Sequence, residues 1–192
     1  MRSGLLSHAD CVARFGERSA ALKTRVELVP DIPHARDLVA AIAGKESWSL
    51  AGVSSEPIAD QATEGLACEL WATSPPGESS YDRDELARCD AGVTGCLALI
   101  AETGSILVTA ADQGGRALSV LPPHHVVIAT AEQLRPDLAS GYAALRERHP
   151  ERLPTQVSFI TGPSRTGDIE RILVLGAHGP KRLTVILIDS SS

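Results

Sequence analysis

The sequence is poor in aromatic residues and in positive charge. Trp, Tyr and Phe make up 3% of its 192 residues, and 18 basic residues face 24 acidic ones, which gives a net charge of −6. Proteins that bind nucleic acids use a basic surface and often aromatic platforms for stacking bases. The composition therefore predicts no nucleic-acid partner, and a core built mainly from Ala, Val, Leu and Ile.

Long apolar runs are also missing. No stretch approaches the ~20 apolar residues that span a bilayer. Residues 1–10 lack the apolar core and small-residue cleavage site of a signal peptide. No basic amphipathic segment suits an anionic membrane surface. We therefore expect a cytoplasmic protein without membrane contacts.

The four cysteines are widely spaced and form no C-x-x-C pair. Iron–sulfur clusters need tightly spaced groups such as C-x2-C-x2-C, and a chain of this length needs no disulfide to bury a core. We interpret Cys11, Cys68, Cys89 and Cys96 as reduced structural thiols. His124 and His125 are adjacent, and neighbours on a strand point to opposite faces, so no metal site is expected.

Common catalytic signatures are absent. The chain has no G-x-G-x-x-G, no G-x-x-x-x-G-K-[ST], no H-E-x-x-H and no G-x-S-x-G. Dinucleotide-binding, nucleotide-triphosphate-binding, zinc-protease and serine-hydrolase functions therefore lack their expected motifs.

Residues 1–24 carry loosely spaced apolar side chains that predict an amphipathic helix, an appendage to one α/β domain over residues 25–192. In that domain, short β-branched runs alternate with helical patterns. Strands are expected at 25–29, 48–53, 68–72, 91–94, 105–110, 125–130, 157–160 and 183–188. Helices are expected at 33–44, 57–67, 84–88, 97–102, 132–148 and 168–174, and residues 73–82 form an internal loop. This alternation predicts a mainly parallel sheet covered on both faces, with ligands beyond the carboxyl ends of its strands.

The turn over residues 161–170 follows an expected strand and precedes an expected helix. Gly162 and Pro163 shape the turn, while Ser164 or Thr166 can cap the helix. Free backbone N–H groups at a helix start bind anions, and Arg165 can add a bidentate donor. Asp168 and Glu170 already complement the helix dipole, so a capped helix without a ligand is the alternative.

A second turn covers residues 92–104. Thr94 and Gly95 can offer backbone donors, and Glu102 ends a largely apolar stretch before Thr103 and Gly104. Apolar surroundings suit a carboxyl group to act as acid, base or nucleophile. The alternative, which we favour, is that Glu102 bonds Thr103, Arg116 or a nearby backbone N–H and fixes the turn.

A third turn, residues 176–180, contains His178 between small residues, next to Gly179. A histidine on such a loop can act as a general acid or base, or it can simply bond the turn at Gly162. The candidate catalytic residues are therefore Glu102 and His178, with ligand contacts expected from the turns around Thr94, Thr103 and Gly162.

The order AETG (101–104), LP (121–122), GPSRTGDIE (162–170) and GAHGP (176–180) resembles the LUD domain of the lactate-utilization protein C family. The resemblance covers residues 90–189; the first 80 residues share only the general pattern. It implies a three-layer α/β/α sandwich similar to the sugar-phosphate isomerase and CoA-transferase superfamily. Some relatives there bind phosphates, sugars or CoA thioesters, and CoA transferases use a Glu nucleophile beside a glycine turn.

The resemblance also implies an accessory role in the oxidation of L-lactate to pyruvate, together with two iron–sulfur partner proteins that carry the redox centres. The alternative is a small-molecule enzyme or binder that acts on a carboxylate, sugar-phosphate or acyl-CoA anion. In that case Arg165 grips the anion, and Glu102 or His178 handles protons or acyl transfer. No cofactor is expected on the chain itself.

Overall fold

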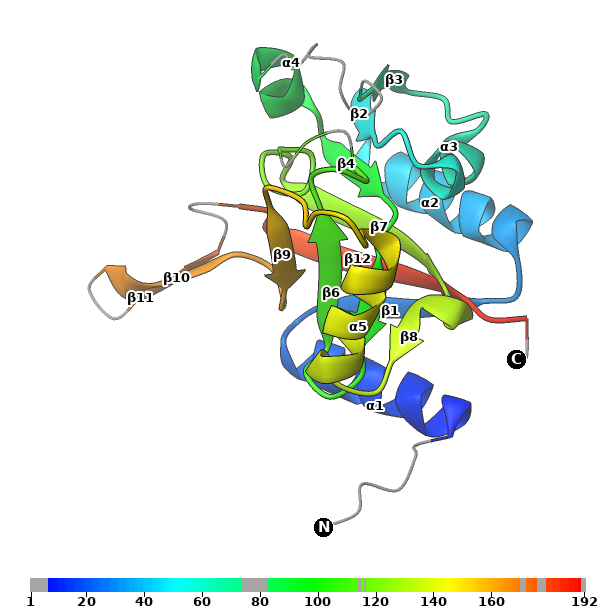
Figure 1. Ribbon diagram of the computed structural model, residues 1–192. Helices are drawn as coiled ribbons and strands as arrows, with labels where there is room; N and C mark the ends of the chain where they lie inside the picture. The colour runs from blue at the N-terminus through cyan, green and yellow to red at the C-terminus, as the bar shows by residue number, and fades with distance from the viewer. Residues whose placement is uncertain are drawn as a thin grey trace.

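The computed structural model describes residues 7–73, 83–113, 115, 117–169, 172–175 and 179–190. Their strands form a six-stranded sheet, a four-stranded sheet and a separate hairpin (Figure 1). Every pairing in the six-stranded sheet is parallel, which confirms the predicted α/β class. Its strands in spatial order are β1 (Arg25–Val29), β12 (Arg182–Ile188), β7 (His124–Thr130), β4 (Ala91–Thr94), β2 (Leu50–Val53) and β3 (Glu69–Ala72).

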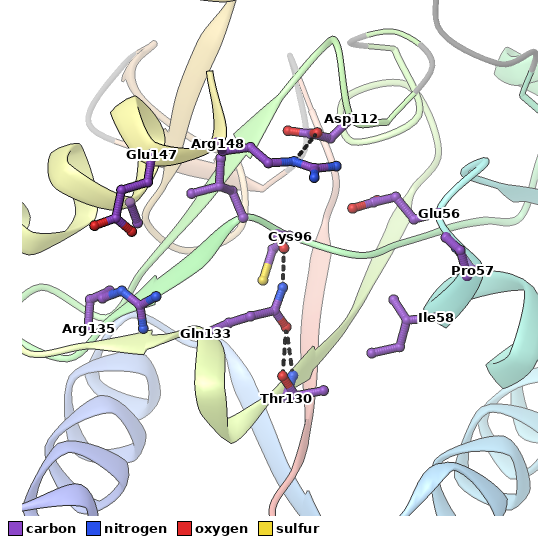
Figure 2. Close-up of a pocket in the computed structure, with 12 residues that line it drawn as sticks. Glu56, Pro57, Ile58, Cys96, Asp112, Thr130, Gln133, Arg135, Glu147 and Arg148 are labelled. Carbon is purple, nitrogen blue, oxygen red and sulfur yellow. Dashed lines mark hydrogen bonds and ion pairs between the residues drawn. The ribbon is translucent and has the colours of Figure 1, made fainter. Parts of the chain in front are cut away.

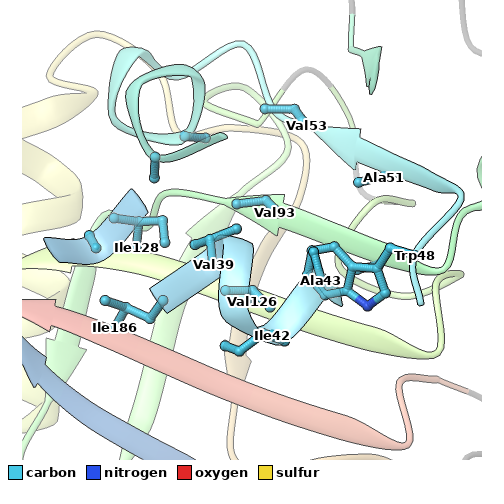
Figure 3. Packing of buried hydrophobic residues seen from close by; sticks show 14 of the residues in the cluster. Val39, Ile42, Ala43, Trp48, Ala51, Val53, Val93, Val126, Ile128 and Ile186 are labelled. Carbon is cyan, nitrogen blue, oxygen red and sulfur yellow. The ribbon is translucent and has the colours of Figure 1, made fainter. Parts of the chain in front are cut away.

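One face of this sheet is covered by α2 (Ile32–Glu46) and α3 (Pro57–Thr63). Val39 of α2 is fully buried in a cluster with Val126 and Ile186 of the sheet (Figure 3). Strands that are buried on both faces read as continuous apolar runs, which is why the central strands were recognisable in the sequence.

The opposite face is covered by α1 (His8–Ala21) and by the four-stranded sheet. The strands of that second sheet, in spatial order, are β8 (Leu134–Arg135), β5 (Ala98–Ile100), β6 (Ser105–Thr109) and β9 (Val157–Ile160). Phe15 of α1 and Leu99 of β5 belong to the core that faces the main sheet, whereas Ile100 packs on the outer side, beneath α5 (Leu138–Arg148). The molecule therefore has an extra layer that the sequence did not predict.

Helix α1 begins with a capping box. The Ser7 hydroxyl accepts the backbone N–H of Asp10, and the Asp10 carboxylate accepts the Ser7 N–H in return. Such reciprocal bonds satisfy N–H groups that have no partner inside the helix. Cys11 and Phe15 then point inward, so the helix predicted for the N-terminal segment is part of the buried core.

Three helix predictions were wrong. Residues 97–102 contain strand β5, since a short apolar run buried on both sides has no diagnostic period. Of residues 168–174, those that the structure describes lie in the antiparallel strands β10 (Arg165–Ile169) and β11 (Ile172–Leu175), and the β-branched content of the segment outweighs its acidic helix-start signal. The helix expected at 132–148 begins only at Leu138, after a 3-10 turn (Ala131–Gln133) and β8.

The remaining helix is α4 (Arg83–Arg88), while residues 74–82 of the predicted loop lie outside the described residues. Within the part of the chain that the structure describes, no helix combines the length and apolar composition that a bilayer crossing requires.

Candidate functional site

The order of the strands marks one position at the edge of the main sheet. After β2 the chain moves outward to β3, whereas after β4 it moves the other way, to β7 and then β12. The connections that leave β2 and β4 therefore diverge at their carboxyl ends. Ligands of open parallel sheets bind at such a point.

A pocket of about 650 Å3 opens there (Figure 2). This volume is within the range of ligand sites for small molecules, roughly 300–1,000 Å3. The lining includes polar side chains from several elements, namely Glu56, Asp112, Gln133, Arg135 and Arg148.

Glu56 follows β2 and immediately precedes Pro57, the first residue of α3. Its Oε2 atom accepts the backbone N–H of Gly95 at 2.8 Å and the Ser54 hydroxyl at 3.0 Å. Burial raises the pKa of the Glu56 carboxyl, and the charge of Asp112 adds to this effect; the hydrogen bonds and Arg148 oppose it. The result is a carboxyl group in a pocket that holds its proton more tightly than an exposed glutamate.

Gly95 makes this arrangement possible. A Cβ atom at Gly95 would lie 2.6 Å from a Glu56 carboxylate oxygen. The predicted anion-binding N–H of Gly95 therefore does bind a carboxylate, but that carboxylate belongs to Glu56. The sequence predicted a backbone donor at Gly95 but not that Glu56 occupies it.

Beneath this turn lies a buried pair of side chains. The Thr94 hydroxyl donates to the Gly95 carbonyl at 2.8 Å and lies 2.9 Å from His125 Nε2, so that nitrogen carries the proton and donates to Thr94. His125 is fully buried, its Nδ1 has no hydrogen-bond partner among the described residues, and burial lowers its pKa to about 3. This histidine is a neutral structural support for the turn.

The side of the pocket away from Glu56 is formed by the segment that follows β7. Gln133 donates to the Cys96 carbonyl, and its Oε1 accepts the Thr130 N–H at 2.7 Å. Arg135 donates from Nη1 to the carbonyls of Glu132 and Leu134, at 2.6 and 3.0 Å. Both side chains are thus held in place by the backbone.

Asp112 and Arg148 complete the pocket on its upper side. Arg148 Nε lies 3.2 Å from Asp112 Oδ1, and His149 Nε2 lies 3.3 Å from Oδ2. Figure 2 shows the guanidinium of Arg148 between Asp112 and Glu56, yet Arg148 and Glu56 form no ion pair. Space for a ligand atom therefore remains between them.

The four cysteines are free thiols, and three of them are buried. Burial raises the pKa of Cys89 to about 11 and the pKa of Cys96 beyond that of Cys89. Thiolates are the reactive and metal-binding form, so these residues act as apolar core, as predicted. Among the described residues, no three His, Cys, Asp or Glu side chains are grouped to hold a metal ion.

Among the described residues predicted for the site, Gly104, Gly162 and Arg165 lie away from the pocket, against the carboxyl end of α1 and Leu22. The turn that joins β5 to β6 contains Glu102, which is exposed, and its N–H donates to the Pro136 carbonyl at 3.1 Å. The apolar surroundings expected for Glu102 are absent because its side chain is exposed, although Ala101 and Gly104 of the same turn are buried. Gly104 adopts a φ of 67°, and a Cβ there would lie 2.9 Å from the Ser19 nitrogen of α1.

The turn at Gly162 meets the same region. Ser105 bonds both Thr103 and Thr161, at 2.7 and 2.8 Å, which ties the two turns together. Gly162 has a φ of 94°, and a Cβ there would lie 2.9 Å from the Leu22 carbonyl. Arg165 donates to that carbonyl.

The helix expected after Gly162 does not exist, so its free N–H groups are absent as well. The Ser164 N–H donates to the Pro180 carbonyl at 2.9 Å, and Gly179 packs beside Ser164. Pro163 is buried. Thr166 and Asp168 lie in β10, and His178 lies outside the described residues. Ser105 therefore joins the turns at Thr103 and Thr161, and the described contacts of these turns are with each other, with Pro136, with Pro180 and with the carboxyl end of α1.

The pocket residues that sequence reasoning missed are Glu56, Asp112, Gln133, Arg135 and Arg148. One signal for Glu56 was available: it directly follows an expected strand, at the kind of edge where ligands bind. Arg135 and Arg148 were missed because the sequence predicted a single helix over residues 132–148. Their position on the pocket depends on the second sheet.

Comparison with known proteins identifies relatives across most of the chain. The family model of the LUD domain matches residues 12–188. Lactate utilization protein C of Deinococcus radiodurans is 41% identical over 112 residues, which are 58% of this chain and 52% of that protein. The protein of the same name from Oceanobacillus iheyensis is 29% identical over 132 residues, 68% of this chain and 55% of its own.

The chain thus spans about half the length of these curated relatives. Among solved structures, a DUF162 family protein from Deinococcus radiodurans superposes with a TM-score of 0.72 at 27% sequence identity. The superposition covers 95% of this chain and 99% of that one.

Proposed function

Because the chain belongs to the LUD domain family, we propose that it is a subunit supporting the oxidation of L-lactate to pyruvate with iron–sulfur partner proteins. The observation that carries this proposal is the group of relatives named lactate utilization protein C. The redox centres are assigned to the partners, since the chain's own buried thiols have raised pKa values and are poor cluster ligands.

The proposal places this role in the cytoplasm. All four cysteines are free, and reduced thiols are typical of that compartment. The partners are proteins with closely spaced cysteines that carry electrons from lactate.

A deletion of the gene in its own organism tests the role. We expect the deletion strain to lose growth on L-lactate as sole carbon source while it keeps growth on glucose, and the wild-type gene to restore it. Reconstituted lactate oxidation by the partner proteins should likewise need this chain. Oxidation at the full rate without it would refute the subunit role.

A second candidate function is favoured by the pocket. Glu56, Gln133 and two arginines around a cavity of about 650 Å3 suit a small-molecule binder or enzyme acting on an anionic ligand. The two candidates are compatible, because a subunit of an oxidising assembly can itself bind the organic acid.

A further inference from the structure

We propose that the pocket is a binding site for a 2-hydroxy or 2-oxo monocarboxylate, whose carboxylate lies between the guanidinium of Arg148 and Oε1 of Glu56. The assignment of this acid class rests on the proposed role in lactate oxidation. The position of the site rests on the contacts of the described residues.

The two oxygens of Glu56 have different surroundings. Oε2 accepts both available donors, the Gly95 N–H and the Ser54 hydroxyl. The proton of the neutral carboxyl group therefore belongs on Oε1, to which no hydrogen bond from another described residue is directed. A neutral carboxyl donates one hydrogen bond, and a carboxylate ligand is a strong acceptor for it.

Arg148 supplies the positive charge. Its side chain is 67% exposed, and its Nε donates to Asp112 Oδ1 at 3.2 Å. Its Nη groups have no hydrogen-bond partner among the described residues. Figure 2 shows the guanidinium on the Glu56 side of Asp112. Because no ion pair closes the gap between Arg148 and Glu56, a carboxylate can bind both.

The charge of the lining disfavours ligands with more than one negative charge. Three acidic residues, Glu56, Asp112 and Glu147, face two arginines, Arg135 and Arg148. A phosphate, with up to two negative charges, would meet more repulsion than a carboxylate. Protonation of Glu56 removes one of the acidic charges, so binding of a carboxylate and protonation of Glu56 support each other.

The groups that face Glu56 are few. Asp112 raises the pKa of Glu56 and Arg148 lowers it. The thiol of Cys96, which lies beside Glu56, stays protonated. His149 acts only through Asp112. Glu56 is therefore the group whose proton should be linked to ligand binding, and His149 is the one that needs a separate control.

Calorimetric titration of the full chain with sodium pyruvate and sodium L-lactate, from pH 5.5 to 8, tests the proposal. Both probes stay anionic over this range. We expect affinity to fall as pH rises, by up to about tenfold per unit above the pKa of Glu56. In Glu56→Gln this dependence should disappear, whereas His149→Gln should keep it.

Arginine variants locate the carboxylate. Arg148→Ala should weaken pyruvate binding by about tenfold or more, as expected for a lost charge-assisted pair. Arg146→Ala, on the same helix but outside the pocket lining, should bind like the wild type. Circular dichroism checks that each variant is folded.

Four outcomes overturn the site: no saturable binding of either acid at millimolar concentration, equal affinity in wild type and Arg148→Ala, unchanged pH dependence in Glu56→Gln, or tighter binding of inorganic phosphate than of pyruvate. The deletion strain separates this proposal from the functional one. Pyruvate binding with normal growth on lactate keeps the site and rejects the lactate role. Loss of growth on lactate without pyruvate binding keeps the lactate role and rejects the site.

Discussion

Strands β5 and β6 connect two contrasting regions of the molecule. Gly95 precedes β5 and Asp112 follows β6, and both lie at the pocket. The turn between the two strands contains Glu102 and Gly104 and packs on α1. The glycine-rich motifs that stand out in the sequence mostly serve the second region, where they allow close backbone packing. The pocket is built from inconspicuous residues that only the fold brings together.

The largest expected effect is on stability in the α1 region. Gly104→Ala places a methyl group against the backbone of α1 at a positive φ, and Gly162→Ala does the same against Leu22. Overpacking and backbone strain together should cost about 3 kcal/mol, measured by urea unfolding. Gly95→Ala meets only the flexible end of Glu56, so it should lose less stability but more ligand binding.

The opposite result would contradict this contrast between the α1 region and the pocket. If Gly104→Ala abolished pyruvate binding while its unfolding free energy stayed at the wild-type value, the α1 region would be the functional one.

The second effect is acid sensitivity under the pocket. The folded-state pKa of His125 is lowered to about 3, so its stabilising contribution is complete above about pH 6.5 and is lost as pH falls toward 3, by about 1.4 kcal/mol per unit. His125→Gln keeps a donor for Thr94 and should flatten the decline of unfolding free energy from pH 6.5 to 4.5. An unchanged decline in His125→Gln would contradict this assignment.

The third effect is a gain in stability. The pKa of Glu56 is raised in the folded protein. Its contribution to the free energy of unfolding is therefore complete below about pH 4.5 and is lost as pH rises through the folded-state pKa. Glu56→Gln should therefore stabilise the protein at pH 7.5 by about 1 kcal/mol, and by less at pH 4.5. Thermal unfolding at both pH values measures this, and a loss of stability at pH 7.5 would contradict it.

The smallest effect is expected at Glu102. Its side chain is exposed on the β5–β6 turn, so Glu102→Gln should change the unfolding free energy by less than about 0.5 kcal/mol and leave pyruvate binding unchanged. A loss of binding in this variant would move the site to the Glu102 turn, one of the three candidate turns that the sequence offered.

The sequence revealed the main sheet because its strands are buried on both faces and carry continuous apolar runs. Two strands of that sheet, at 25–29 and 91–94, were predicted with the observed bounds, and so was β9 at 157–160. The sequence did not reveal that β9 belongs to a second sheet. The apolar run at 97–102 fits a helix as well as a strand, and only its burial between the main sheet and α5 decides.

The site was predicted in part for the same reason. Gly95 was recognised as a backbone donor beyond a strand, which is a local property. Its partner Glu56 lies 39 residues earlier, and Arg148 reaches the pocket only because α5 packs on the second sheet. Such contacts depend on the order of the strands, which one sequence does not specify.

The most direct test of the account is a ¹H–¹⁵N NMR titration of the labelled protein with sodium pyruvate at pH 6. The account predicts saturable shifts of the Gly95 and Gln133 amides that are lost in Arg148→Ala, with Gly104 and Gly162 unmoved. Shifts confined to Gly104, Gly162 and Ser164 would contradict it.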